Sequence, residues 1–174
     1  MAPMNTTAPS LKQAAVGDLE NEIATTRRVL ERVRDEHLDW KPHAKSMALG
    51  GLATHLATLP TYGSKILGSD ELDFATRMPP NPIATTRDEV LSRFDAAVAD
   101  LRALMEAADD TALATPWTLR RGEQIVLRHT KAGMLRTFFL SHMIQHRGQL
   151  SVYLRLLDIP VPSIYGPSAD EGGF

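Results

Sequence analysis

The chain has 174 residues, a formal net charge of −2 at pH 7 and no cysteine. A chain of this length can bury a hydrophobic core, so we expect a single domain over residues 1–174. The lack of cysteine excludes disulfides, a cysteine nucleophile and thiolate metal ligands, so a metal site must use nitrogen and oxygen donors. Acidic and basic residues are spread without a basic stripe, which argues against nucleic acid as a partner.

The N-terminal segment, residues 1–10, is polar, contains two prolines and is expected to be flexible. It has no apolar run of the kind found in a secretory signal. No stretch of the chain approaches the apolar length needed to cross a bilayer, so we expect no membrane partner. The default expectation is a cytoplasmic protein.

Four segments carry the apolar spacing of amphipathic helices. The first runs from about Leu11 to Arg34, before a break at Trp40-Lys41-Pro42. The second begins near Ser46, a good N-cap residue, and ends at Gly68. Pro60 lies inside this second helix, and it should bend the helix or remove one of its hydrogen bonds.

The third helical segment begins at Thr86, where Thr86 and Glu89 have the spacing of a capping box. Its apolar stripe continues to Met105, and residues 109–116 are expected to form a connection. A proline-rich loop, residues 78–82, separates this helix from the preceding one.

Two short alternating runs, Trp117–Leu119 and Gln124–Leu127, flank Gly122 and suggest a small β-hairpin. The fourth helical segment follows from about Thr130 to Leu157, and the tail over residues 163–174 is expected to have little regular structure. Four amphipathic helices with long connections predict an all-α four-helix bundle, with this short hairpin before the last helix.

Three histidines lie within these apolar helical patterns. His142 and His146 are spaced i and i+4, so they share one helix face, and His55 lies between Leu52 and Leu59 in the second helix. Three imidazoles from two helices, without a fourth protein ligand, form the ligand set of an open divalent-metal site. Each histidine alone could instead be a hydrogen-bonded core residue. One metal ion, however, would satisfy three buried imidazoles that otherwise each need a partner.

The motifs of other metal and catalytic sites are absent. Met143, Ile144 and Gln145 separate the two histidines, so the zinc-protease pattern with its helical glutamate is missing. Phe139 and Met143 stand where a di-iron site would need glutamate, which favours a mononuclear site. Phosphate-binding glycine loops and dinucleotide fingerprints are also missing.

Other side chains near these histidines have simpler interpretations. Gln149, three residues after His146, could support that imidazole or lie at the edge of the core. Arg147 is expected at the surface or at a helix contact. Tyr62 and Tyr153 lie seven residues after a candidate ligand; their hydroxyls could reach the site, but core packing is the expectation.

The remaining three histidines and a glycine pair have weaker signals. His37, His43 and His129 are expected to be solvated, although His43 or His129 could line the mouth of a cleft. Gly50-Gly51 is expected to relieve crowding near a helix start or at the entry to the site.

Five stretches of the chain are similar to one known family. They are GLATHL at 51–56, LSHMIQHRGQL at 140–150, YLRLL at 153–157, IPVP at 159–162 and YGPS at 165–168. In these stretches the chain resembles the DinB-like superfamily, the DinB/YfiT group, and the likeness extends from about Leu11 to the tail. The resemblance implies an antiparallel four-helix bundle that frequently forms a homodimer.

The resemblance also implies one divalent ion at His55, His142 and His146, most often zinc or nickel, with iron, cobalt and manganese as alternatives. Family members with assigned chemistry include transferases and isomerases that use a low-molecular-weight thiol. The implied function is a metal-dependent thiol S-transferase or a hydrolase acting on a small molecule. The alternatives are a non-catalytic, stress-related protein that binds metal or a small ligand, and a helical dimerisation scaffold whose core histidines bind no metal.

Overall fold

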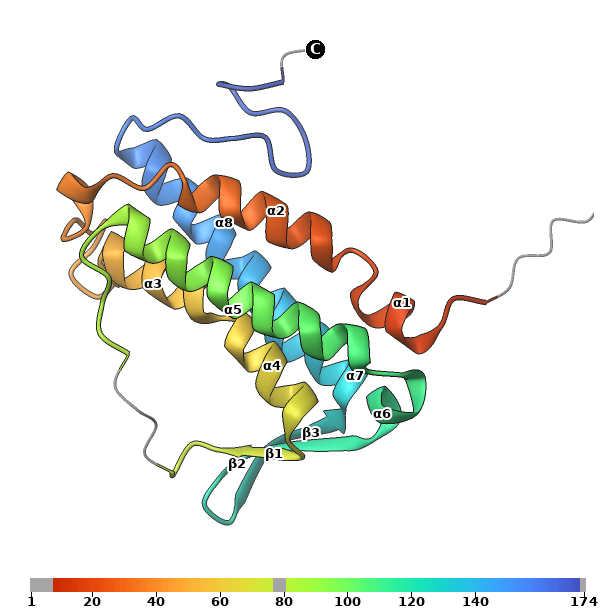
Figure 1. The fold of residues 1–174 in the computed structure, drawn as a ribbon. Coiled ribbons are helices and arrows are strands. Elements are labelled where there is room, and N and C mark those ends of the chain that lie inside the picture. Colours follow the sequence, from red (N-terminus) through yellow and green to blue (C-terminus); the bar gives the residue numbers. More distant parts are fainter. Residues whose placement is uncertain (1–7, 77–80, 173–174) are drawn as a thin grey trace, which may run out of the picture.

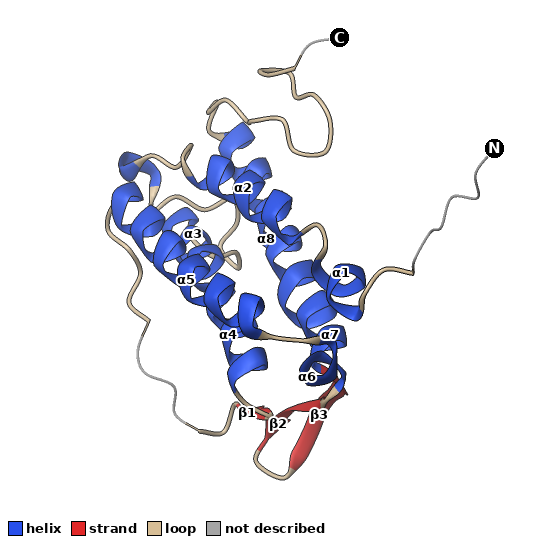
Figure 2. Ribbon diagram, turned by 45° about the vertical axis from the view of Figure 1, so that its right-hand side comes forward, coloured by secondary structure: helices blue, strands red, loops and turns tan. Residues whose placement is uncertain are grey.

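The computed structural model describes residues 8–76 and 81–172 and is mostly helical, with a small sheet at one end of the molecule (Figures 1 and 2). Parts of the predicted flexible N-terminus, proline-rich loop and tail lie outside the described residues. The helical elements are α1 (Leu11–Val16), α2 (Leu19–Leu30), the 3-10 turn η1 (Asp35–His37), α3 (Leu49–Thr58), α4 (Pro60–Gly68), α5 (Arg87–Ala107), α6 (Asp110–Ala114), α7 (Lys131–Met134), the π-helical turn η2 (Leu135–Leu140) and α8 (Ser141–Leu156). The strands are β1 (Glu71–Asp73), β2 (Pro116–Arg121) and β3 (Gln124–Thr130).

The first predicted helix is broken into α1 and α2 at Gly17, contrary to the continuous helix expected from its apolar stripe. A Cβ at Gly17 would lie 2.5 Å from the Gln13 carbonyl oxygen, so a larger residue would force the backbone of this turn to shift. The backbone N–H groups of Leu11 and Lys12 donate to the Asp110 carboxylate, which ties α1 to α6. These contacts between distant segments turn α1 away from the line of α2 (Figure 1).

The second predicted helix is divided into α3 and α4 at Pro60, as expected, because proline at the first position of α4 lacks the N–H that a continuous helix would use. The predicted start at Ser46 is wrong. The Leu49 and Gly50 N–H groups donate to the carbonyls of Trp40 and Leu38, each at 2.8 Å. The preceding chain therefore satisfies the first donors of α3, and no side-chain cap is needed.

The third predicted helix is α5, and Thr86 is its N-cap, since its hydroxyl accepts from the Glu89 N–H at 3.1 Å. The predicted capping box is only half formed. The Glu89 carboxylate accepts from the Thr85 N–H at 2.9 Å rather than from Thr86. The connection expected after α5 contains the short helix α6.

The predicted hairpin is confirmed as the antiparallel pair β2 and β3, with Gly122 in the left-handed region at φ 59°. The sequence did not predict β1, which pairs parallel to β2 and places Leu72 opposite Leu119. The sheet is therefore mixed, and the fold is mostly helical rather than all-α. The antiparallel four-helix arrangement stays a prediction.

The fourth predicted helix is continuous from the N-cap Thr130, but its middle turn is π-helical. The Ser141 hydroxyl donates to the Arg136 carbonyl, five residues back, at 2.9 Å. Such wide turns insert one residue into a helix and change which face the following residues present. In α8 the fully buried residues are Met143, Arg147, Leu150 and Leu154.

One hydrophobic core joins the helices to the inner side of the sheet. The largest fully buried side chains on it include Trp117 on β2, Phe94 on α5 and Phe139 in the π-helical turn. Within the part of the chain that the structure describes, no helix combines the length and apolar character that a membrane crossing requires.

Candidate metal centre

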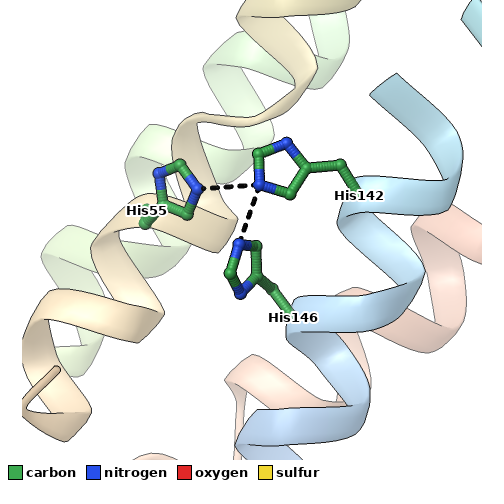
Figure 3. A group of neighbouring side chains, drawn as sticks. All are labelled: His55, His142 and His146. Carbon is green, nitrogen blue, oxygen red and sulfur yellow. Dashed lines mark hydrogen bonds between the residues drawn. The ribbon is translucent and has the colours of Figure 1, made fainter. Parts of the chain in front are cut away.

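The structure brings together the three histidines that the sequence singled out. His55 on α3 faces His142 and His146 on α8, and the three rings point toward one another (Figure 3). The Nε2 atom of His142 lies 3.3 Å from that of His55 and 2.8 Å from that of His146. One ring nitrogen from each residue lies within 4.8 Å of the other two.

The local helix geometry explains this convergence. His142 and His146 lie one turn apart on α8, and their ring centroids are 4.6 Å apart. Helices α3 and α8 pack against each other, so His55 faces the pair with its centroid 5.1 Å from His142. The π-helical turn ends immediately before Ser141 and sets the face on which the α8 pair emerges.

The donor set fits a metal ion better than it fits hydrogen bonds. The His142 Nε2 atom contacts two other imidazole nitrogens, yet one ring nitrogen offers either a single lone pair or a single proton. It can therefore form a normal hydrogen bond with only one of them. Ligand nitrogens about 2.0–2.1 Å from a tetrahedral zinc ion lie roughly 3.3 Å apart. The spacing between His55 and His142 equals this value, and the 2.8 Å between His142 and His146 is shorter.

The three imidazoles are partly buried, which corrects the expectation that they lie on the buried face of the helix. Burial, followed by the proximity of His146 and His142, lowers the pKa of His55 to about 4. Burial and His146 also lower the pKa of His142. Both rings are therefore neutral at pH 7, with lone pairs available to a cation.

Gln149 fixes the orientation of one imidazole. Its side-chain oxygen accepts a hydrogen bond from Nδ1 of His146 at 2.6 Å. A proton on Nδ1 leaves the Nε2 lone pair facing the other two histidines. Of the two interpretations of Gln149 drawn from the sequence, the structure therefore favours support of His146.

Tyr62 and Tyr153 are partly buried and pack against the hydrophobic core, in line with the packing role expected for them. The Tyr62 ring packs edge-on against Phe138, which in turn lies 6.4 Å from the His142 ring. The Tyr153 hydroxyl donates to the Met47 carbonyl.

Arg147 forms the helix contact that the sequence offered as one of two alternatives, but its full burial was not predicted. Its side chain is 1% exposed and forms an ion pair with Glu22 on α2, with Nη1 2.6 Å from Oε2. Arg147 therefore belongs to the packing of α8 on α2. His43 and His129 are exposed, as predicted, and do not join the histidine cluster.

Among residues 8–76 and 81–172, no carboxylate lies close enough to join the three imidazoles as a further ligand. A hollow of about 430 Å³ reaches His55. Its walls include Gly51, which the sequence offered as a residue at the entry, and Met47, Thr54 and Asn81, which the sequence did not single out. The cluster is thus a three-nitrogen site with space beside it for another molecule. A separate hollow of about 410 Å³ lies between α1, α2 and α5, away from the histidines.

Comparison with known proteins gives one family match and several similar proteins. A family model described as "DinB family" matches residues 10–172. The chain is 28% identical over 155 residues to the "Uncharacterized protein YrdA" of Bacillus subtilis strain 168, covering 87% of this chain and 86% of that protein.

Two solved structures share the fold. A DinB-like protein from Bacillus cereus ATCC 10987 aligns with a TM-score of 0.66 and 20% identity, covering 88% of this chain and 97% of the other. The DinB-like protein YjoA from Bacillus subtilis aligns with a TM-score of 0.64 and 17% identity, covering 84% and 95% of the two chains.

Proposed function

The chain belongs to the DinB family, and on this premise we propose that it is an enzyme with one divalent metal ion held by His55, His142 and His146. The observation that carries the proposal is the convergence of three imidazole nitrogens on one point from two helices. No carboxylate joins them among the described residues, so a bound ion would keep a position for a substrate.

The donor set indicates the chemistry. Neutral imidazoles leave a divalent ion its full charge, and such an ion lowers the pKa of a coordinating thiol or water. Zinc and nickel are the leading candidates, and iron, cobalt and manganese accept the same ligands. Two neighbouring residues support the ligands. Gln149 orients His146 so that the Nε2 lone pair of the imidazole faces the ion, and the Phe138 ring lies beside His142.

We favour a thiol-dependent S-transferase. In this reaction the sulfur of a low-molecular-weight thiol bonds to an electrophilic carbon of a small substrate, while the thiol proton and the leaving group depart. The hollow beside His55 provides room for both reactants. A hydrolase is the second candidate, because the same partly exposed centre admits water in place of the thiol.

The test is a turnover assay on metal-loaded protein with a low-molecular-weight thiol and a small electrophile. We expect turnover that His142→Ala abolishes and that His129→Ala, which removes an exposed histidine outside the cluster, leaves unchanged. Turnover of an ester without any thiol would assign hydrolysis instead. Metal binding without turnover in either assay would assign the non-catalytic binding role and refute the enzyme proposal.

The homodimer and the cytoplasmic location implied by the resemblance and the composition belong to the same proposal. Size-exclusion chromatography with light scattering measures the oligomeric state, and a monomer would contradict the proposed homodimer.

A further inference from the structure

A groove leads away from the histidine cluster along α3. The hollow that reaches His55 meets a second one, of about 370 Å³, and the two share Ala48, Gly51 and Ile83 in their walls. The second hollow continues to Asp35 and Asp39. Side by side, the two hollows extend from His55 to these two carboxylates.

Gly51 lies at the junction of the two hollows. It precedes His55 by four residues on α3, so both lie on the same face of the helix. A Cβ at Gly51 would have as its nearest neighbour the Ile83 Cδ1 atom, at 3.9 Å, which is an ordinary contact. Close packing therefore does not require glycine here, and the missing side chain creates open space.

The adjacent Gly50 serves a different purpose. Its Cβ would lie 3.1 Å from the Leu38 carbonyl oxygen and 3.2 Å from the Leu38 Cβ, so Gly50 permits the close approach of the preceding chain. The sequence suggested that the pair relieves crowding or opens the entry to the site. The structure divides these two roles between the two residues.

The wall opposite α3 is held in place by hydrogen bonds. The Ala84 N–H donates to the hydroxyl of Thr54, a 3% exposed residue on α3, at 2.9 Å. Arg93 donates to the Pro82 carbonyl at 2.6 Å, which anchors the same segment to α5. The groove is therefore bounded by fixed elements on both sides.

The lining indicates the kind of molecule that would fit. Met47 and Ile83 are large apolar side chains that remain 44% and 59% exposed on the groove walls. Apolar surface exposed beside a polar centre is typical of ligand sites. The carboxylates of Asp35 and Asp39 at the far end disfavour an anionic group and favour an amine or hydroxyl.

We propose that Gly51 is a specificity-determining residue that opens this groove to an elongated thiol, with its sulfur near His55, an apolar stem beside Ile83 and a cationic or neutral end near Asp39. This inference rests on the proposed thiol-dependent function. It differs from that function in assigning the shape and charge of the ligand and the residue that selects it.

The experiment is a titration of cobalt-substituted protein, in which thiolate binding changes the visible and near-ultraviolet absorption of Co²⁺. The probes are mercaptoethanol as the short thiol, and aminohexanethiol and mercaptohexanoate as long thiols of opposite end charge. The variants are Gly51→Leu, which fills the junction, and Gly51→Leu/Ile83→Ala, which reopens it. Metal content is measured for each variant, and Gly51→Ala is the control for replacing a helical glycine.

We expect Gly51→Leu to bind cobalt and mercaptoethanol as the wild type does but to bind aminohexanethiol roughly ten- to hundredfold more weakly, the range that hydrophobic-pocket discrimination gives. The Ile83→Ala change should restore part of this loss. The wild type should prefer aminohexanethiol to mercaptohexanoate, and Asp39→Asn should reduce that preference.

Two results would overturn the groove assignment while leaving the proposed function intact. One is unchanged binding of the long thiols by Gly51→Leu, and the other is an equal loss for short and long thiols at normal cobalt content. No spectral response of the cobalt-loaded wild type to any thiol would instead refute thiol binding itself, and the inference with it.

Discussion

Removal of either partner of the buried ion pair between Glu22 and Arg147 should strongly destabilise the protein. The two side chains are 7% and 1% exposed and lie 2.6 Å apart. Arg147 also donates to the Tyr165 hydroxyl at 2.6 Å, and this hydroxyl donates to the Glu22 carboxylate at 2.9 Å. Arg147→Met leaves the Glu22 carboxylate buried without its cation, which costs about 3–5 kcal/mol for a pair of this kind.

The size of this effect matters because a domain has a total stability of only about 5–15 kcal/mol. The Glu22→Leu change should cost a similar amount, since it leaves the guanidinium buried. The double variant, Glu22→Leu with Arg147→Met, should cost much less than the sum of the two, because no uncompensated charge is then buried.

Urea denaturation of the metal-free protein, followed by circular dichroism, measures all three variants as a double-mutant cycle. If Arg147→Met lowers the free energy of unfolding by less than about 1 kcal/mol, the reasoning is refuted, because ion pairs exposed to solvent contribute only that much. Additive losses in the double variant would also refute it.

Three further predictions concern the metal centre and the packing around it. Gln149→Leu should lower metal affinity about 10–100-fold, because His146 loses its orienting acceptor; competition with a chromogenic chelator measures this, and unchanged affinity would contradict the assigned role. Gly63→Ala should lower the free energy of unfolding by roughly 1–3 kcal/mol, because the new Cβ would lie 2.9 Å from the Leu101 Cδ1 atom. Urea denaturation measures this loss, and an unchanged free energy would show that neighbouring side chains can move to make room. The metal-free protein should lose stability as the pH falls from 6.5 to about 4, because the unfolded state protonates His55 before the folded state does. Urea denaturation at each pH gives the free energy of unfolding, which should fall less with pH for His55→Gln than for the wild type. An identical pH dependence in the two proteins would show that His55 does not cause the loss of stability.

Several features that depend on local sequence were predicted correctly. The i and i+4 spacing of His142 and His146 places both on one helix face whatever surrounds the helix. Pro60 interrupts a helix because it lacks an N–H, and Gly122 permits the turn of a hairpin. The prediction that His55 joins them was less direct, because it required α3 to pack against α8, which no local pattern specifies.

The features that depend on distant contacts were missed. The break at Gly17 depends on the tie between α1 and α6, and the burial of Arg147 depends on Glu22. Strand β1 is only three residues long and is stabilised by pairing with β2, so its own sequence carries little signal. The groove at Gly51 forms only when the segment before α5 packs on α3.

The most direct test of the central claim is the metal content of the purified protein, measured by mass spectrometry without an affinity tag for wild type and His142→Ala. The proposed centre predicts about one divalent ion per wild-type chain and its loss in the variant. A wild-type protein that holds no metal, even after dialysis against divalent ions, would contradict the claim and return the three histidines to the role of packing residues.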